Sequence, residues 1–269
     1  MSRFLPLLTL VVTGALGSAS ASAANLVWHW EDRFSPTEKR KLQAWVSETA
    51  DAVEALVAPF PFDIHIHFFR TSSRSPVPWA NTIRSERQGV NFHVNPSASA
   101  DRLRDDWTAY HELSHLLIPY LGRRHSWFAE GFASYMQYQV MRSHGVISTD
   151  KMELMYQQKI GRAERRYRMD DLPFVKAAPK LRAQRQYPTM YWGGAVYFLR
   201  IDQALKEKGT SIPDVLREFV DCCRHSTRGL NNLVAELDRI AGTDVFRSEL
   251  DKVRTLPGFP DDSPVWTTD

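Results

Sequence analysis

The spacing of apolar residues changes along the chain, and each change predicts a different kind of element. Residues 37–57 place apolar side chains at helical spacing behind Ser35 and Pro36, which favour a helix start. Residues 62–69 alternate apolar and polar side chains, as a half-buried strand does, and residues 89–95 follow the same alternation. The N-terminal part of the chain therefore predicts a helix and two strands of a small sheet.

The polar positions of these strands leave two questions open. If the strand at residues 89–95 is the sheet edge beside a cleft, its backbone could pair with an extended peptide; the alternative is an ordinary paired strand. His65 and His67 point away from the apolar face and are expected on the solvent side. A second metal site there is the alternative, although no nearby pair of carboxylates completes it.

Two adjoining helices are predicted in the middle of the chain. The first covers residues 102–118 and ends before Pro119. The second covers residues 127–142, with Ser126 as its N-cap and Gly145 just past its end. Because the link between them is short, we expect the two helices to pack side by side.

Helical spacing then dominates the chain after residue 191. It recurs in four segments separated by glycines, at residues 195–206, 213–223, 230–240 and 245–253. This order of elements predicts an α+β fold with a small N-terminal mixed sheet, a helix pair and a helical C-terminal lobe. We expect an N-terminal α/β lobe with an edge strand at residues 24–98, and the helix pair with the C-terminal lobe at residues 99–269.

Residues 1–23 have the features of a secretory signal peptide. Arg3 precedes an apolar run over residues 4–16, and Ala21-Ser22-Ala23 supplies the small residues of a cleavage site. We therefore expect an exported protein, periplasmic or secreted, with no stable membrane insertion after cleavage. The alternative is an uncleaved anchor, although the apolar run is shorter than the roughly 20 residues that a spanning helix needs.

Composition bounds the class of protein. With 269 residues, of which 43% are apolar and 12% aromatic, the chain can bury a substantial core. The net charge of +3 is too small and too dispersed to indicate a nucleic-acid partner. A basic cluster at residues 162–168, followed by Lys180, Arg182 and Arg185, is the exception. It is either a solvated helix face or the border of a cleft that favours acidic substrates.

The two cysteines, Cys222 and Cys223, are adjacent. An exported protein permits disulfides, but we expect these two to remain unbridged, because a vicinal pair falls well short of the usual Cα separation of roughly 5.5 Å. Cys223 shares a helical stripe with Leu216, Phe219 and Val220, so a packing role is predicted for it.

The strongest chemical signal is His111-Glu112-Leu113-Ser114-His115. On a helix, residues four apart lie on one face, so both imidazoles can bind one Zn²⁺ ion. Glu112 then lies beside the metal as a general base rather than as a ligand. Glu130, near the start of the second helix, is the expected third ligand, and a fourth position stays open for water.

Weaker assignments exist for some of these residues. Glu130 could instead be a carboxylate favoured at a helix N-terminus by the macrodipole. His125 and His144 are spare imidazoles and are expected at the surface or half buried near helix ends.

These motifs resemble the glutamate-zincins, in particular the M1 and M61 aminopeptidase-like branch. Trp127-Phe128-Ala129-Glu130-Gly131-Phe132-Ala133 is similar to the Trp-x-x-Glu-Gly-Phe-Ala segment of that branch. Tyr191-Trp192-Gly193-Gly194-Ala195 is similar to its Tyr-x-Lys-Gly-Ala segment, with Gly193 in place of Lys. The resemblance implies a thermolysin-like zincin catalytic core in which Tyr191 supports the tetrahedral intermediate. A packing role for Tyr191 among neighbouring aromatics is the alternative.

One departure from the M1 pattern bears on the substrate. The family has a Gly-x-Met-Glu-Asn segment that holds the free amino end of a substrate, and residues 74–81 contain neither Glu nor Gly. Exopeptidase action is therefore not supported by the sequence.

Together these features predict an exported zinc metallopeptidase that acts on a peptide or protein. A secreted binding or scaffolding protein that keeps the zincin fold without turnover is the alternative, and hydrolysis of a non-peptide such as an epoxide is a third possibility. The sequence leaves the specificity, the choice of endo- or exo-cleavage, any lid over the cleft and the oligomeric state undetermined.

Overall fold

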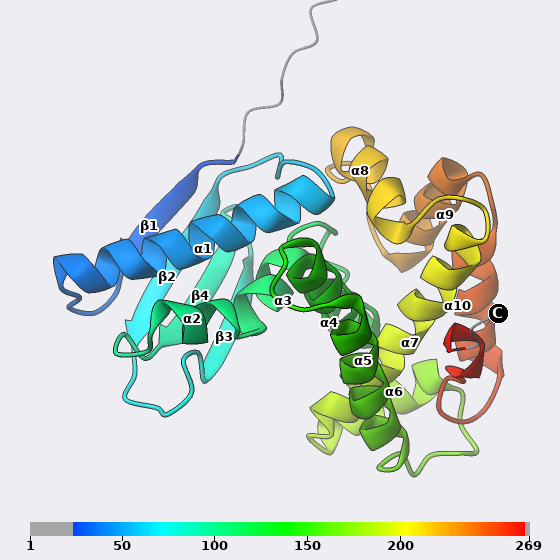
Figure 1. The fold of residues 1–269 in the computed structure, drawn as a ribbon. Coiled ribbons are helices and arrows are strands. Elements are labelled where there is room, and N and C mark those ends of the chain that lie inside the picture. The colour runs from blue at the N-terminus through cyan, green and yellow to red at the C-terminus, as the bar shows by residue number, and fades with distance from the viewer. Residues whose placement is uncertain (1–23, 267–269) are drawn as a thin grey trace, which may run out of the picture.

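The computed structural model describes residues 24–266, so the predicted signal peptide lies outside the described residues. A small sheet covered by one long helix lies beside a larger helical body (Figure 1). This arrangement confirms the predicted α+β class with an N-terminal sheet and a helical C-terminal part. None of the helices in this range combines the length and the apolar character needed to cross a membrane.

The sheet has four strands in the order β1-β2-β4-β3. Strands β1 (Leu26–Trp30), β2 (Ile64–Arg70) and β4 (Gln88–Val94) run parallel, and β3 (Trp79–Arg84) pairs antiparallel with β4. The two predicted strands are therefore present, but β1 and β3 were not predicted. Because β4 lies inside the sheet, it is not the edge strand considered above; β3 is that edge.

The helix predicted over residues 37–57 is present as α1 (Pro36–Leu56), and it covers one face of the sheet. Ile64, Ile66 and Phe68 of β2 are fully buried on that face, and Trp45 of α1 packs on Phe92 of β4 with ring centroids 5.2 Å apart. The alternation of apolar and polar residues along β2 therefore matches its buried and open faces.

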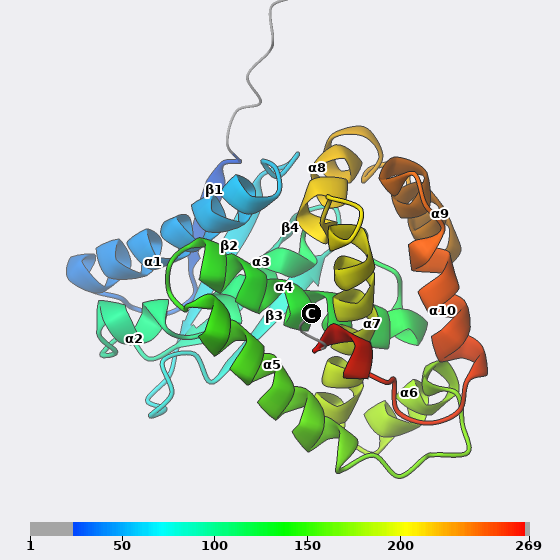
Figure 2. The ribbon, with the colours of Figure 1, turned by 45° about the vertical axis from the view of Figure 1, so that its right-hand side comes forward.

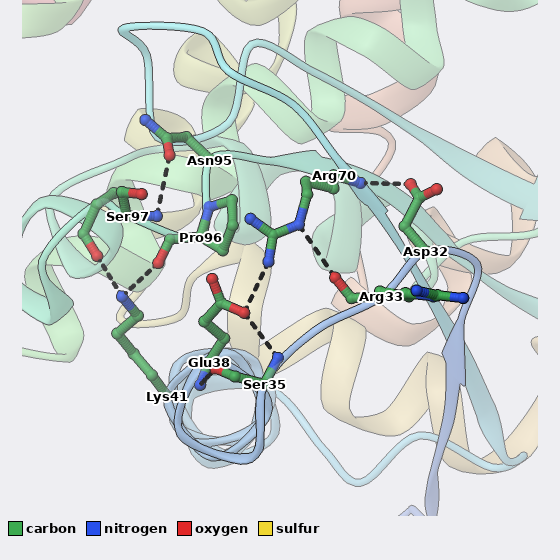
Figure 3. A network of polar contacts seen from close by, with 10 residues as sticks. Asp32, Arg33, Ser35, Glu38, Lys41, Arg70, Asn95, Pro96 and Ser97 are labelled. Atoms are coloured by element: carbon green, nitrogen blue, oxygen red, sulfur yellow. Dashed lines mark hydrogen bonds and ion pairs between the residues drawn. The ribbon is translucent and has the colours of Figure 1, made fainter.

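A network of polar contacts fixes the start of α1 against the sheet (Figure 3). Ser35 and Glu38 form a capping box in which the Ser35 N–H donates to Glu38 Oε2 at 2.7 Å. Arg70, at the end of β2, donates to the same carboxylate at 2.7 Å. Lys41 donates to the carbonyl of Pro96 at 2.7 Å, which ties α1 to the loop after β4.

The predicted helix over residues 102–118 is wrong in one respect, because two helices occupy the segment. They are α2 (Ala100–Arg104) and α3 (Thr108–His115). The Asp106 carboxylate accepts the N–H of Thr108 at 2.9 Å and so competes with helical bonding at the break. The second predicted helix is present as α4 (Ser126–Ser143), which follows the short 3-10 helix η1 (Arg123–His125).

Six helices complete the body. They are α5 (Thr149–Glu164), α6 (Phe174–Ala183), α7 (Tyr187–Lys206), α8 (Ile212–Cys222), α9 (Leu230–Ala241) and α10 (Val245–Thr255), with the short 3-10 helix η2 (Ser263–Val265) near the end. The four helices predicted after residue 191 correspond to α7–α10, whereas α5 and α6 were not predicted. Helix α7 runs through the body against α4 and α5 (Figure 2).

Cys222 and Cys223 form a disulfide, so the prediction of unbridged cysteines is wrong. Cys222 is the last residue of α8 and Cys223 is its C-cap, outside helical geometry. The helix that carries the predicted stripe therefore ends one residue before Cys223, and Cys223 is only partly buried against the core.

Candidate metal centre

Helices α3 and α4 bring two imidazoles and one carboxylate together. His111 and His115 lie one turn apart on α3, and Glu130 lies in the second turn of α4. Glu130 Oε2 is 3.2 Å from His111 Nε2 and 3.4 Å from His115 Nε2. We call these three residues the metal centre.

The donor atoms of the metal centre fit a zinc ion. Two ligands that share a tetrahedral zinc at 2.0–2.1 Å are separated by about 3.3 Å, which is close to the observed N···O distances. Two imidazoles and a carboxylate are also the ligand set of catalytic zinc sites that leave one position open. Among residues 24–266, this is the group of three potential metal ligands whose atoms converge, within 4.8 Å of one another.

The charges within the metal centre favour a cation. Burial would raise the pKa of Glu130, but the charge of His115 and the hydrogen bonds to both imidazoles outweigh it and hold the pKa well below its usual range. Burial would lower the pKa of His111, yet hydrogen bonding to Glu130 and the charges of Glu112 and Glu130 raise it. Without a metal, the centre therefore attracts a proton to the place that a metal ion would take.

Gln137 orients His111. Its Oε1 accepts from His111 Nδ1 at 2.9 Å, which directs Nε2 toward Glu130. Gln137 and Glu130 lie two turns apart on the same face of α4. Gln137 was not predicted from the sequence, although its spacing from Glu130 is a signal that could have identified it.

Glu112 is buried beside the metal centre and belongs to the same cavity. Thr82 Oγ1 of the edge strand β3 donates to Glu112 Oε2 at 2.7 Å. This bond fixes one oxygen of the carboxylate and leaves the other available. Thr82 was missed because the strand that carries it was not predicted.

Two arginines hold the end of α3, where helical carbonyls lack partners. Arg84 donates to the carbonyls of His115 and Ile118, and Arg224 donates to that of Leu116 at 2.7 Å. Burial lowers the pKa of Arg84 to about 10, against the raising effects of Glu112 and Glu130, so its guanidinium stays charged at neutral pH. Both cations also suit the negative end of the helix dipole.

Tyr191 lies in the second turn of α7 and lines the same cavity. Its ring stacks on His111 with centroids 6.2 Å apart. Burial, followed by the charges of Glu130 and Glu112, raises the pKa of Tyr191 far above its usual value. The phenol therefore stays protonated and can act only as a neutral hydrogen-bond donor or acceptor.

Two glycines set the distance between α4 and α7. A Cβ on Gly131 would lie 2.3 Å from the carbonyl carbon of Gly194, and one on Gly194 would lie 2.2 Å from the carbonyl oxygen of Trp127. The missing side chains at these two positions therefore allow α7 to approach α4 closely. This contact places Tyr191 next to the metal centre.

The metal centre opens into a cavity of about 490 Å³ between the edge strand and helices α3, α4 and α7. Residues 77–82 form one wall, and Tyr187, Met190 and Tyr191 form part of another. The carboxylates that line it are Glu112 and Glu130.

The other histidines do not join the metal centre. His125 belongs to η1 and His144 caps the end of α4. On the open face of the sheet, His29 of β1 accompanies His65 and His67, and we call these three the sheet-face histidines. His29 Nε2 is 2.9 Å from His65 Nδ1, and the rings of His29 and His67 stack at 4.1 Å.

Comparison with known proteins finds solved structures with a similar fold. No family model and no curated protein matches the chain. Among solved structures, an aminopeptidase N family protein from Idiomarina loihiensis has a TM-score of 0.68 at 14% identity over 89% of this chain and 46% of its own length. An M1 zinc metallopeptidase mutant from Deinococcus radiodurans, bound to a Tyr-Ser-Ala substrate, has a TM-score of 0.53 at 14% identity over 88% and 50%.

Yeast LTA4 hydrolase in complex with bestatin gives a TM-score of 0.56 at 12% identity, over 88% of this chain and 39% of its own length. The chain thus spans half or less of these structures. At this level of identity the likeness concerns the fold, and the described chain shares its fold with zinc metallopeptidases of the M1 aminopeptidase N family.

Proposed function

We propose that the protein is an exported zinc metallopeptidase of the M1-like glutamate-zincin type, with a thermolysin-like zincin core. The observation that carries this proposal is the convergence of His111, His115 and Glu130, with the Glu112 carboxylate beside them. The shared fold and the motifs around Glu130 and Tyr191 support it. Export rests on the signal-peptide features of residues 1–23.

His111, His115 and Glu130 would hold one zinc ion. When bound, zinc would lower the pKa of a water molecule to about 7 and polarise the carbonyl of the scissile bond. Glu112, held by Thr82, takes the proton of the attacking water and passes it to the leaving amine. Tyr191 donates a hydrogen bond to the carbonyl oxygen as negative charge develops there.

The edge strand β3 is the proposed binding site for the substrate backbone. Its outer edge borders the cavity, and an extended peptide can pair with such an edge. The carboxylates that line the cavity are Glu112 and Glu130, and both have a role in the proposed chemistry. Within residues 24–266, no further carboxylate lines the cavity to hold the free amino terminus of a substrate. We therefore expect cleavage within peptides rather than removal of single N-terminal residues.

Cleavage of a peptide library by the purified protein, with and without chelator, tests this function. Glu112→Gln should lower kcat about 10²–10⁴-fold while zinc content is unchanged, because Glu112 is not a ligand. A protein that binds zinc but cleaves no peptide, with or without Glu112, would instead be the secreted binding or scaffolding protein. Cut positions report endo- or exo-cleavage, and cleavage of a non-peptide substrate alone would redirect the assignment to another hydrolase.

A further inference from the structure

A second cavity of about 260 Å³ adjoins the metal centre. It shares Trp107, His111, Tyr187 and Tyr191 with the main cavity, so the two spaces meet at the metal centre. Helices α4 and α7 supply part of the remaining lining, and helix α5 with the turn after it supplies one wall, including Lys159, Arg162 and Arg166. We call these three residues the basic triplet.

The basic triplet faces no compensating acid. No aspartate or glutamate lines this cavity, and no ion pair or side-chain hydrogen bond joins the triplet to any residue in the range 24–266. Burial and the charge of Arg162 lower the pKa of Lys159. The cavity is therefore a site of positive charge next to the metal centre.

The spacing of the triplet is unfavourable for the free protein. Lys159 and Arg162 lie three residues apart on α5, where like charges destabilise a helix, and Arg166 lies in the turn that follows α5; Arg162 and Arg166 are exposed and Lys159 is half buried. An acidic residue at any one of these positions would relieve the repulsion, as the i,i+3 pair of Arg217 and Asp214 does elsewhere. A negatively charged group entering the cavity would relieve it in the same way.

We propose that this second cavity is a subsite for a carboxylate of the peptide substrate, an inference that rests on the proposed peptidase function. Arginine suits this task because its planar guanidinium binds a carboxylate through two parallel hydrogen bonds. The carboxylate belongs either to an Asp or Glu side chain or to the C-terminus of the peptide. A substrate that lies across the metal centre along β3 would reach the subsite past Tyr191.

Binding of labelled peptides to the Glu112→Gln protein tests the subsite without requiring turnover. Each position of one short peptide is changed in turn to Glu and to Gln, and each peptide is made with a free and with an amidated C-terminus. We expect one Glu position, or the free C-terminus, to tighten binding about tenfold. A Glu-specific effect assigns the side chain, and an effect lost on amidation assigns the C-terminal carboxylate.

The triple substitution Lys159→Gln, Arg162→Gln and Arg166→Gln should abolish this preference and leave binding of the neutral peptides unchanged. Arg165→Gln is the matched control, because Arg165 is exposed like its neighbours Arg162 and Arg166 but lines neither cavity. Circular dichroism checks that each variant is folded, and single substitutions replace the triple one if it is not. The preference should also weaken as salt is raised.

Equal affinity for all charged and neutral peptides, or a preference that survives in the triple variant, would overturn the subsite. This result is distinct from failure of the proposed function. A protein that cleaves peptides without any acidic preference keeps the function and loses the subsite. A protein that cleaves nothing but binds the acidic peptides through the triplet keeps the subsite and loses the function.

Discussion

The metal centre and the sheet-face histidines are both groups of histidines, yet only the metal centre has the arrangement of a metal site. The side chains of His111 and His115 are 4% and 7% exposed, and both point their Nε2 atoms at one carboxylate oxygen. The sheet-face histidines lie on the open side of the sheet, where the His67 imidazole contacts Glu31, the residue that follows the edge strand β1. A group of histidines alone therefore does not make a metal site. A third ligand from a second helix or strand and a fixed orientation of the imidazole rings are also needed.

The largest expected difference between the two groups is in zinc content. His115→Ala removes one of three ligands and should abolish both zinc binding and hydrolysis. His65→Ala, which removes a sheet-face histidine, should leave both unchanged. Metal analysis of the two purified variants makes the comparison, and loss of zinc from His65→Ala would show that the sheet-face group holds the metal.

Tyr191→Phe separates chemistry from packing around His111. The substitution keeps the ring that stacks on His111 and removes only the hydroxyl. If the hydroxyl donates to the developing oxyanion, kcat should fall about 10²-fold with zinc content unchanged. Unaltered kcat in Tyr191→Phe would assign Tyr191 to packing alone.

A smaller effect is expected from the groups that orient the imidazoles. Gln137→Leu removes the partner of His111 Nδ1 and should weaken zinc binding by about 10–100-fold. Glu31→Gln makes the corresponding change at His67 and should have no effect on zinc affinity. Competition with a fluorescent chelator measures both, and equal weakening in the two variants would remove the distinction between the groups.

The metal centre and the sheet-face histidines should also differ in how they change the stability of the fold with pH. The pKa of His111 is raised, so in the metal-free protein its protonation stabilises the fold at pH values below about 6.5, and this stabilisation is lost as pH rises through the folded pKa. Because zinc needs the neutral imidazole, the increase in Tm on adding zinc should be larger at pH 8 than at pH 6. Thermal unfolding with and without zinc tests this; an increase that grows toward acid pH would contradict it.

His29 should behave in the opposite sense. Burial, then the charges of His67 and His65, lower its pKa, so it contributes a loss of stability as pH falls below about 6.5. In an NMR titration of the imidazole protons of the metal-free protein, the pKa of His29 should be lower than that of His111.

The parts of the site that could be predicted are those fixed by spacing along one helix. Positions 111, 112 and 115 have their geometry set by the helical repeat, and Glu130 follows after a short link. The sequence motif therefore identified the residues that the fold brings together. The predicted elements were right where the apolar period was regular, as in α1 and β2.

The parts that could not be predicted depend on tertiary contacts. Strand β3 shows no clear alternation of apolar and polar residues, and none of its residues is buried, so neither the true sheet edge nor the partner of Glu112 was apparent. Arg84 and Arg224 act on the end of α3 from distant segments. The disulfide depends on where α8 ends. The helical spacing of apolar residues predicted an end at Cys223, whereas α8 ends one residue earlier, at Cys222.

The most direct test of the proposed zinc site is anomalous diffraction from crystals of the zinc-loaded protein, measured on both sides of the zinc absorption edge. We expect one strong peak within bonding distance of His111 Nε2, His115 Nε2 and a Glu130 carboxylate oxygen, with no peak at the sheet-face histidines. A peak at the sheet-face histidines and none at the metal centre would contradict it.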